Sequence, residues 1–201
     1  MGKESVISMK ALLGDALVAQ DGAIGFIADV YFDDRLWTVR YLVVDTGHPM
    51  PRREVLIRPA LIAPEQPRNE AIRVYLTRAQ VEKFPDADTD RPVYRQYDMA
   101  ANVAHYGDAH LRSAEVVMGY RALTLDGGAG QVEDLVIDRQ TWAIVHVVVS
   151  TRTWLPWKSV LVAPGAVQRI DRPERKVHLR LTCAALRTLP GAQDRGARCC
   201  A

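Results

Sequence analysis

The sequence has few of the features that mark a secreted or membrane-spanning chain. Its 201 residues include only three cysteines, Cys183, Cys199 and Cys200. An odd number, with two adjacent near the C-terminus, argues against a disulfide framework. No apolar run approaches the roughly 18 residues of a membrane helix, and the first twenty residues lack the apolar core of a signal peptide. We therefore expect a cytoplasmic protein without membrane insertion.

A strong excess of one charge is also missing. The formal net charge is +2, and charged residues make up 25% of the chain. Such a balance gives no broad electrostatic attraction to nucleic acid or anionic lipid. The hydrophobic fraction of 48% is ordinary for a globular chain, and the length is sufficient for one good core or two small ones.

Patterns typical of catalysis or metal binding are scarce. The glycine-rich stretch DGGAG at 126–130 precedes a predicted strand, so it lacks the helix N-terminus that binds phosphate. His105, Asp108 and His110 lie close in sequence, but the two histidines are not at the i, i+4 spacing of a helical zinc pair. We expect them to lie on an exposed polar connector. No combination of nucleophile, base and orienting group is visible, so we predict no enzyme activity, no catalytic residue, no cofactor and no metal.

What the sequence does contain is an internal repeat. Asp21-Gly22 recurs as Asp126-Gly127, an offset of 126 − 21 = 105 residues. Residues 8–85 and 113–190 align at this offset without a gap, and 19 of the 78 positions are identical. Self-similarity over this length indicates that one structural unit is present twice.

Each copy has the pattern of short strands followed by one helix. The Asp-Gly dipeptides predict hairpins. Thr77 is a candidate N-cap for a short helix that ends at Pro85. Between these signals the stretch GFIADVYF alternates, which predicts a strand with two faces. The faces are Phe26, Ala28, Val30 and Phe32 on one side and Ile27, Asp29 and Tyr31 on the other.

Several short strands in so small a unit favour a sheet that closes into a barrel, because closure removes exposed edges. Gly25 and Gly130 stand where a bend or bulge would help the sheet to turn. We predict a mainly β protein of two small barrels, each with a short C-terminal helix, packed as a pseudo-two-fold pair. The predicted segments are a first barrel at 6–85, a connector at 86–112 with a helix near 94–105, a second barrel at 113–190 and a disordered tail at 191–201.

These stretches resemble the PRC-barrel family. The similarity rests on DGAIGFIADVYFDDRLWTVRYLVVDTG, on its copy DGGAGQVEDLVIDRQTWAIVHVVVSTRTWLP, and on the connector DRPVYRQYD with the following HLRSAEVVMGYRA. The family includes the photosynthetic reaction-centre H subunit, the C-terminal domain of a ribosome maturation factor and standalone bacterial proteins with two barrels in tandem. The resemblance covers residues 6–190 and implies an assembly or interaction module. It implies no reaction, because the family has no agreed catalytic residues.

Five aspartates could be paired acids, as in a glycosidase, or turn-formers. They are Asp29, Asp33 and Asp34 in the first copy and Asp134 and Asp138 in the second. Asp33 and Asp34 fall between two strands, where aspartate bonds its own turn backbone, so we favour turns. Asp29 and Asp134 are expected to bond a neighbouring strand or loop.

The copies differ most in one loop, at 47–53 and 152–158. The second copy carries Trp154 and Trp157 there, and the first carries Arg52 and Arg53. Tryptophan is enriched at binding hot spots, so we predict that these four residues bind a protein partner. Packing between the two barrels is the alternative for the tryptophans.

The favoured function is thus a non-enzymatic scaffold that binds a protein, and a homodimer is also compatible with the sequence. The alternatives are a module that contacts RNA or the ribosome, or an assembly factor for a photosynthetic complex. The RNA alternative depends on a basic stretch diluted by Asp171 and Glu174. Its cations are Arg169, Arg172, Arg175, Lys176 and Arg180.

Overall fold

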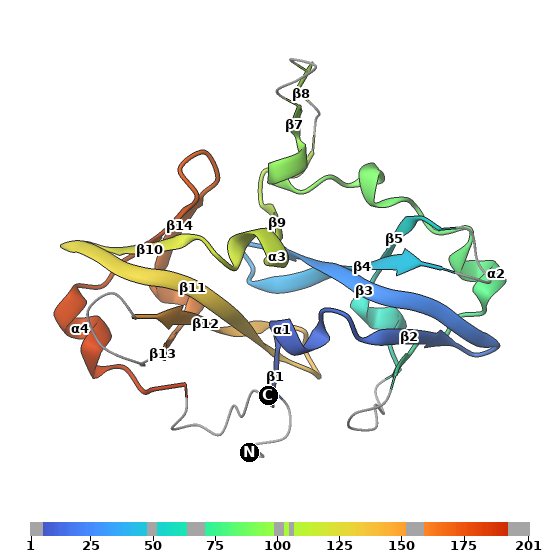
Figure 1. Ribbon diagram of the computed structural model, residues 1–201, viewed down its shortest axis with the longest axis horizontal. Coiled ribbons are helices and arrows are strands. Elements are labelled where there is room, and N and C mark those ends of the chain that lie inside the picture. The colour runs from blue at the N-terminus through green and yellow to red at the C-terminus, as the bar shows by residue number, and fades with distance from the viewer. Residues whose placement is uncertain are drawn as a thin grey trace. The chain divides into compact units, whose positions relative to one another are not determined.

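The computed structural model describes residues 6–47, 52–63, 71–98, 103–104, 107–151 and 159–192, and these are mainly β (Figure 1). The chain divides into two compact units. We call Ala11–Ser113 the N-terminal unit, and Met1–Lys10 with Ala114–Ala201 the C-terminal unit. No helix in the described part is long and apolar enough to cross a bilayer.

The N-terminal unit contains one sheet in the strand order β5-β4-β3-β2-β6, with β9 paired to a second stretch of β3. The long strand β3 runs through the middle of this sheet and is blue in Figure 1. The strands are β2 (Ala16–Ala19), β3 (Gly22–Asp33), β4 (Thr38–Thr46), β5 (Glu54–Ile57), β6 (Ile72–Arg73) and β9 (Leu111–Ser113). The helical elements are α1 (Met9–Leu12), at the boundary of the units, η1 (Pro59–Leu61), α2 (Arg78–Val81), η2 (Ala87–Thr89) and η3 (Val93–Arg95).

The C-terminal unit repeats this arrangement with the order β13-β12-β11-β10-β15-β14, and β1 pairs with the far part of β11. Its strands are β1 (Val6–Ser8), β10 (Arg121–Thr124), β11 (Gly127–Asp138), β12 (Ile144–Ser150), β13 (Ser159–Val162), β14 (Val167–Asp171) and β15 (Lys176–Leu179). The helical elements are α3 (Ala114–Val117), η4 (Pro164–Ala166) and α4 (Cys183–Thr188). The bounds of β2, β3 and β5 reappear 105 residues later as those of β10, β11 and β13.

The mainly β prediction is therefore confirmed, and so are the short helices that follow the strands of each copy. The Thr77 hydroxyl accepts a hydrogen bond from the Gln80 backbone, which closes a capping box at the start of α2. The Thr182 hydroxyl accepts a hydrogen bond from the Ala185 N–H at the start of α4. Both strand orders are open among the described strands, because no pairing joins β5 to β6 or β13 to β14. Closure into barrels stays a prediction.

The predicted helix near residues 94–105 is wrong where the chain is described. The connector forms the short 3-10 turn η3 and then a two-stranded ribbon of β7 (Tyr97–Asp98) and β8 (Val103–Ala104). The Gln96 amide donates to the carbonyls of Arg91 and Asp108, at 2.9 and 2.8 Å. These bonds hold a loop together, and the ladder that pairs Tyr97 with Ala104 and Asp98 with Val103 gives the chain there an extended conformation in place of a helix.

The predicted faces of β3 are also partly wrong, because a β-bulge interrupts the alternation. Ile27 pairs with Val44, but Asp29 pairs with Val43, so one residue is extra on β3. Residues directly opposite in an antiparallel pair share a face. Phe26 is therefore on the face of Asp29 and Tyr31. Ile27, which is 1% exposed, joins the core face with Val30 and Phe32.

The core face of the first sheet is formed by apolar residues of β3, β4 and β5. In the N-terminal unit it consists of Ile27, Val30, Phe32, Leu42, Val44, Val55 and Ile57, each at most 1% exposed. On the opposite face a smaller cluster joins the sheet to the connector: Tyr31, Val43, Leu56, Ala87 and Leu111, with Tyr41 packed against it. Val136, Val148 and Leu161 form the equivalent cluster of the C-terminal unit, against which Ala192 packs.

The start of the predicted tail is ordered as far as it is described. Gly191 forms a β-bridge with Val160, and the Ala192 N–H donates to the Ser159 carbonyl at 2.7 Å. Residues 193–201, which include Cys199 and Cys200, lie outside the described residues. The repeat thus extends at least two residues beyond Pro190.

Gly25 and Gly130 have a structural reason to be repeated. A Cβ on Gly25 would lie 2.0 Å from the Asp45 carbonyl oxygen, and one on Gly130 would lie 1.9 Å from that of Ser150. Gly130 also has φ of +136°, a conformation that side chains disfavour. Register shifts next to both positions show that the sheets bend there, as predicted.

The largest difference from the predicted segments is an exchange of strands. β1 belongs to the first copy of the repeat but pairs with β11, whereas its equivalent β9 pairs with β3. The chain therefore leaves the C-terminal unit after Lys10, forms the whole N-terminal unit, and returns at Ala114.

We expect Gly130→Ala to destabilise the protein by more than about 1 kcal/mol, because the added Cβ meets backbone and the positive φ disfavours alanine. The measurement is urea unfolding followed by circular dichroism. Gly128→Ala is the matched control, since no atom lies within 4 Å of a Cβ there, and its change should stay within about 0.5 kcal/mol. Equal effects of the two substitutions would contradict this account of the bend.

Candidate functional site

Two buried aspartates each fasten a short strand to a long one. Asp29 is 5% exposed, and its Oδ2 accepts a hydrogen bond from the Ser113 hydroxyl on β9 at 2.5 Å. Its Oδ1 accepts from the Val30 N–H at 2.7 Å. Asp29 and its equivalent Asp134 each lie at a β-bulge of their long strand. The prediction that Asp29 bonds a neighbouring strand is confirmed.

Asp134 repeats this arrangement in the C-terminal unit. It is 4% exposed and accepts hydrogen bonds from the Ser8 hydroxyl on β1 and from the backbone N–H groups of Leu135 and Lys10. The Lys10 N–H belongs to the first turn of α1, so the same carboxylate holds both the end of β1 and the start of the helix. Because these bonds use both oxygens of each carboxylate, the pair is structural.

The prediction that Asp33 and Asp138 form turns is confirmed. Asp33 Oδ1 accepts from the Arg35 and Leu36 N–H groups at 2.8 and 3.0 Å. Asp138 Oδ1 accepts from the two equivalent N–H groups, both at 2.9 Å. The following Trp37 and Trp142 adopt left-handed conformations with φ of 53° and 58°, and the Trp37 ring stacks on Phe32.

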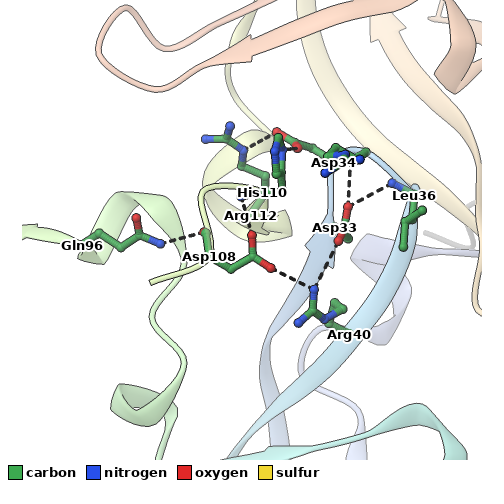
Figure 2. Close-up of polar contacts among 9 residues, drawn as sticks. Asp33, Asp34, Leu36, Arg40, Gln96, Asp108, His110 and Arg112 are labelled. Atoms are coloured by element: carbon green, nitrogen blue, oxygen red, sulfur yellow. Dashed lines mark hydrogen bonds and ion pairs between the residues drawn. The ribbon is translucent and has the colours of Figure 1, made fainter. Parts of the chain in front are cut away.

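Asp34 has a role that the sequence did not indicate. Its Oδ2 accepts from Arg112 Nε at 2.6 Å, and its Oδ1 lies 2.7 Å from His110 Nδ1 (Figure 2). The Asp34 N–H also donates to the His110 carbonyl at 3.0 Å. The carboxylate therefore binds the β3–β4 turn to the segment that leads into β9.

A second ion pair adjoins the first. Arg40 Nη1 on β4 lies 3.2 Å from Asp33 Oδ2 and 3.0 Å from Asp108 Oδ2, so one guanidinium joins the turn to the connector (Figure 2). Asp108 Oδ1 accepts from the His110 N–H at 2.8 Å. His110 and Asp108 therefore belong to a charged cluster with Asp34, Arg40 and Arg112, rather than to a free polar connector.

Contacts at the turn and in the cluster lower the pKa of Asp33. Burial alone would raise the pKa of this carboxyl group. The Leu36 and Arg35 N–H groups and the Arg40 guanidinium outweigh burial and hold the pKa below its ordinary value. Asp33 is therefore ionised at neutral pH and supplies the negative charge that Arg40 needs.

The C-terminal unit does not carry the residues of this cluster. At the offset of 105, Arg139 replaces Asp34, Val145 replaces Arg40, and Ile7 replaces Arg112. The two copies therefore hold their exchanged strands differently. Comparison of the copies for changes of charge could have found the cluster from sequence, although not its contacts.

The predicted partner-binding residues fall into three groups. Arg53 is engaged in the fold, because its guanidinium donates to the Glu82 and Phe84 carbonyls, both at 2.7 Å. The Arg52 side chain is 84% exposed and meets Asp45 Oδ2 at 3.4 Å. Trp154 and Trp157 lie outside the described residues, as does His48.

Phe26 is a surface residue that the predicted alternation placed on the wrong face. It is 45% exposed, although it lies in the central strand of its sheet. Register pairs it with Ala16 on β2 and with Asp45 on β4, so these three side chains share one face. Asp45 also contacts the exposed Arg52. The bulge at Asp29 is what turns Phe26 outward.

Tyr31, on the same face of β3 as Phe26, is not a candidate base. Tyr31 is fully buried, and burial raises the pKa of its phenol far above the ordinary value. The nearby Tyr94 raises it further. Arg95, next in the chain, pairs with Glu54 at 3.0 Å. The phenol therefore stays neutral within the apolar cluster.

The basic stretch forms the β14–β15 hairpin, where opposite charges are interleaved. Arg169 Nη2 lies 3.6 Å from Asp171 Oδ2 and 3.3 Å from His178 Nε2. Lys176 Nζ lies 2.6 Å from Glu174 Oε2. Asp171, Glu174 and His178 offer ligand atoms within 4.8 Å of one another. However, the two cations already occupy these groups, so the hairpin fits a ladder of ion pairs better than a metal site.

Comparison of the chain with models of known families and with curated proteins finds no match.

We expect Ser113→Ala to lower the free energy of unfolding by about 1.5–3 kcal/mol, because a buried carboxylate loses a hydrogen bond. Ser113 is 2% exposed, whereas Ser8 is half-buried. Ser8→Ala should therefore cost less, since water can replace the lost hydroxyl. Urea unfolding of both variants measures the difference, and a larger loss for Ser8→Ala would refute the assignment.

The lowered pKa of Asp33 predicts a pH dependence of stability. A carboxyl group with a depressed folded-state pKa stabilises the fold above its unfolded pKa of about 3.9, and this contribution is lost as the pH falls through the folded value. The melting temperature of Asp33→Asn should therefore lie below that of the wild type at pH 7, and the gap should shrink below about pH 4. Asp88→Asn, at a largely exposed position, is the control. A gap that is unchanged at pH 3 would contradict the prediction.

Proposed function

We propose that this chain is a non-catalytic protein-binding module built from two PRC-type barrels in tandem. The support comes from the sheet that repeats at a constant offset and from the glycines that let both sheets bend at the same position. The aspartates that the sequence offered as candidate acids are used in turns, bulges and ion pairs.

One observation carries the proposal: Phe26 is exposed in the middle of a sheet, beside a charged pair. Burial of a phenylalanine side chain stabilises a complex by roughly 1.5–3 kcal/mol. Arginine and aromatic residues are also enriched among interface hot spots. Phe26 and Arg52 both adjoin Asp45 and thus offer an apolar contact and a cation. We call Phe26, Asp45 and Arg52 the Phe26 face.

The chemistry of the Phe26 face defines its partner. The partner presents an apolar side chain that covers the phenyl ring and an acidic group that pairs with the exposed Arg52 guanidinium. In the second copy Gln131 replaces Phe26 and Ser150 replaces Asp45. The partner therefore binds the N-terminal unit alone through this face. Trp154 and Trp157 remain predicted contacts for the C-terminal unit.

The test is recovery of partners on the tagged full-length chain, compared between variants. Phe26→Ser combined with Arg52→Ala should reduce a specific partner at least tenfold, because both contacts are lost. Leu125→Ser is the matched control, since Leu125 is 66% exposed but lies in the C-terminal unit, and it should leave recovery unchanged.

Other outcomes of the same experiment decide against the proposal. Equal recovery by the double variant and the wild type would refute the Phe26 face. A partner that disappears after ribonuclease treatment, with binding that falls steeply with salt, would favour RNA instead. The pair Trp154→Ala and Trp157→Ala, tested separately, decides the prediction for the second loop.

A further inference from the structure

The two exchanged strands occupy equivalent sites. Ser8 on β1 pairs with Val136, and Ser113 on β9 pairs with Tyr31, which is 105 residues before Val136. In each site a short strand lies antiparallel to the last residues of a long strand, and its serine donates to the aspartate in the bulge. The site on β11 therefore recognises a short extended segment that ends in serine.

The two strands are held unequally. β9 is buried at Leu111 and Ser113, which are 0% and 2% exposed, and the ion pair of Arg112 with Asp34 secures it further. In β1 the terminal Val6 is 45% exposed. Its neighbour Ile7 replaces Arg112 and so offers no charge. β1 is the more weakly secured strand and therefore the easier one to release.

The covalent path between β1 and its site is long. β1 joins the rest of its unit only through Ala11–Ser113, which is 113 − 11 + 1 = 103 residues. The link that leads directly out of β1 is the short helix α1. Every copy of the chain carries the same β1, so a second copy offers the site a segment with identical side chains and the same serine.

We propose that the edge of β11 at Val136–Asp138 also accepts β1 from a second copy, so that the chain forms a strand-exchanged dimer. The donated strand makes the same ladder with residues 136–138, and its Ser8 hydroxyl donates to Asp134 of the receiving copy. Exchange of an identical element costs little, because the donated strand forms the same hydrogen bonds as the strand that it replaces. This dimer does not depend on the Phe26 face.

The first test is the mass of the full-length chain in solution, measured by light scattering over a range of concentrations. A dimer fraction that rises with concentration is expected. A chain that stays monomeric up to its solubility limit would overturn the proposal.

Complementary variants then identify the interface. A donor-deficient chain carries Ile7→Pro and Ser8→Ala, because proline cannot complete the ladder. An acceptor-deficient chain carries Asp134→Ala. Each alone should dimerise at least tenfold more weakly than the wild type. A mixture of the two should recover heterodimers, in which the intact β1 of one chain enters the intact site of the other. Dimers of either variant alone at wild-type strength would show that the interface lies elsewhere and refute the exchange.

A third measurement uses only wild-type chains and so avoids variants that fold poorly. A synthetic peptide of residues 2–10 competes for the site on β11 and should suppress dimers between two differently tagged wild-type copies. The same peptide with the Ile7→Pro and Ser8→Ala substitutions is the control and should have no effect. Equal behaviour of the two peptides would contradict the proposed site.

Discussion

The structure depends on an aspartate placed in a β-bulge and bonded to the serine of a sequence-distant strand. The bulge allows the Asp29 carboxylate to lie beside the sheet backbone, where it accepts from a neighbouring N–H group as well as from Ser113. Asp134 does the same with Ser8. A buried carboxylate is costly unless its oxygens are satisfied. Each aspartate therefore requires the hydrogen bond from its serine, and that bond holds the short strand that contains the serine against the long strand.

This constraint explains why the connector is not a passive linker. It must deliver β9 to β3, and the ion pairs of Asp34 and Arg40 fix its path at the turn between β3 and β4. The N-terminal unit thus depends on residues that follow the first copy of the repeat. In the C-terminal unit the same task falls to the first residues of the chain, without these ion pairs.

Much of the secondary structure could be predicted from sequence. The repeat shows the same strand pattern twice, and Thr77 is an N-cap residue that indicates the start of a helix. The wrong face for Phe26 has a simple cause: alternation has period two, and one extra residue in a bulge reverses every position before it. The cluster of Asp34 with His110 joins residues 76 apart, and local patterns carry no information on such distances. The exchange of strands could not be predicted from sequence. Because the two copies are similar, β1 and β9 could each pair with β3 or with β11, and the sequence does not favour one arrangement.

The exchange also sets the order in which the molecule can be completed during synthesis. Ser8 leaves the ribosome 136 − 8 = 128 residues before Val136, its partner in the sheet. At about 5–20 residues per second, β1 waits roughly 6–26 s for its site to exist. The N-terminal unit is complete only once Ser113 has emerged. β1 is thus made well before the strand that receives it, and throughout that interval a nascent neighbour on the same message can present a β1 of its own.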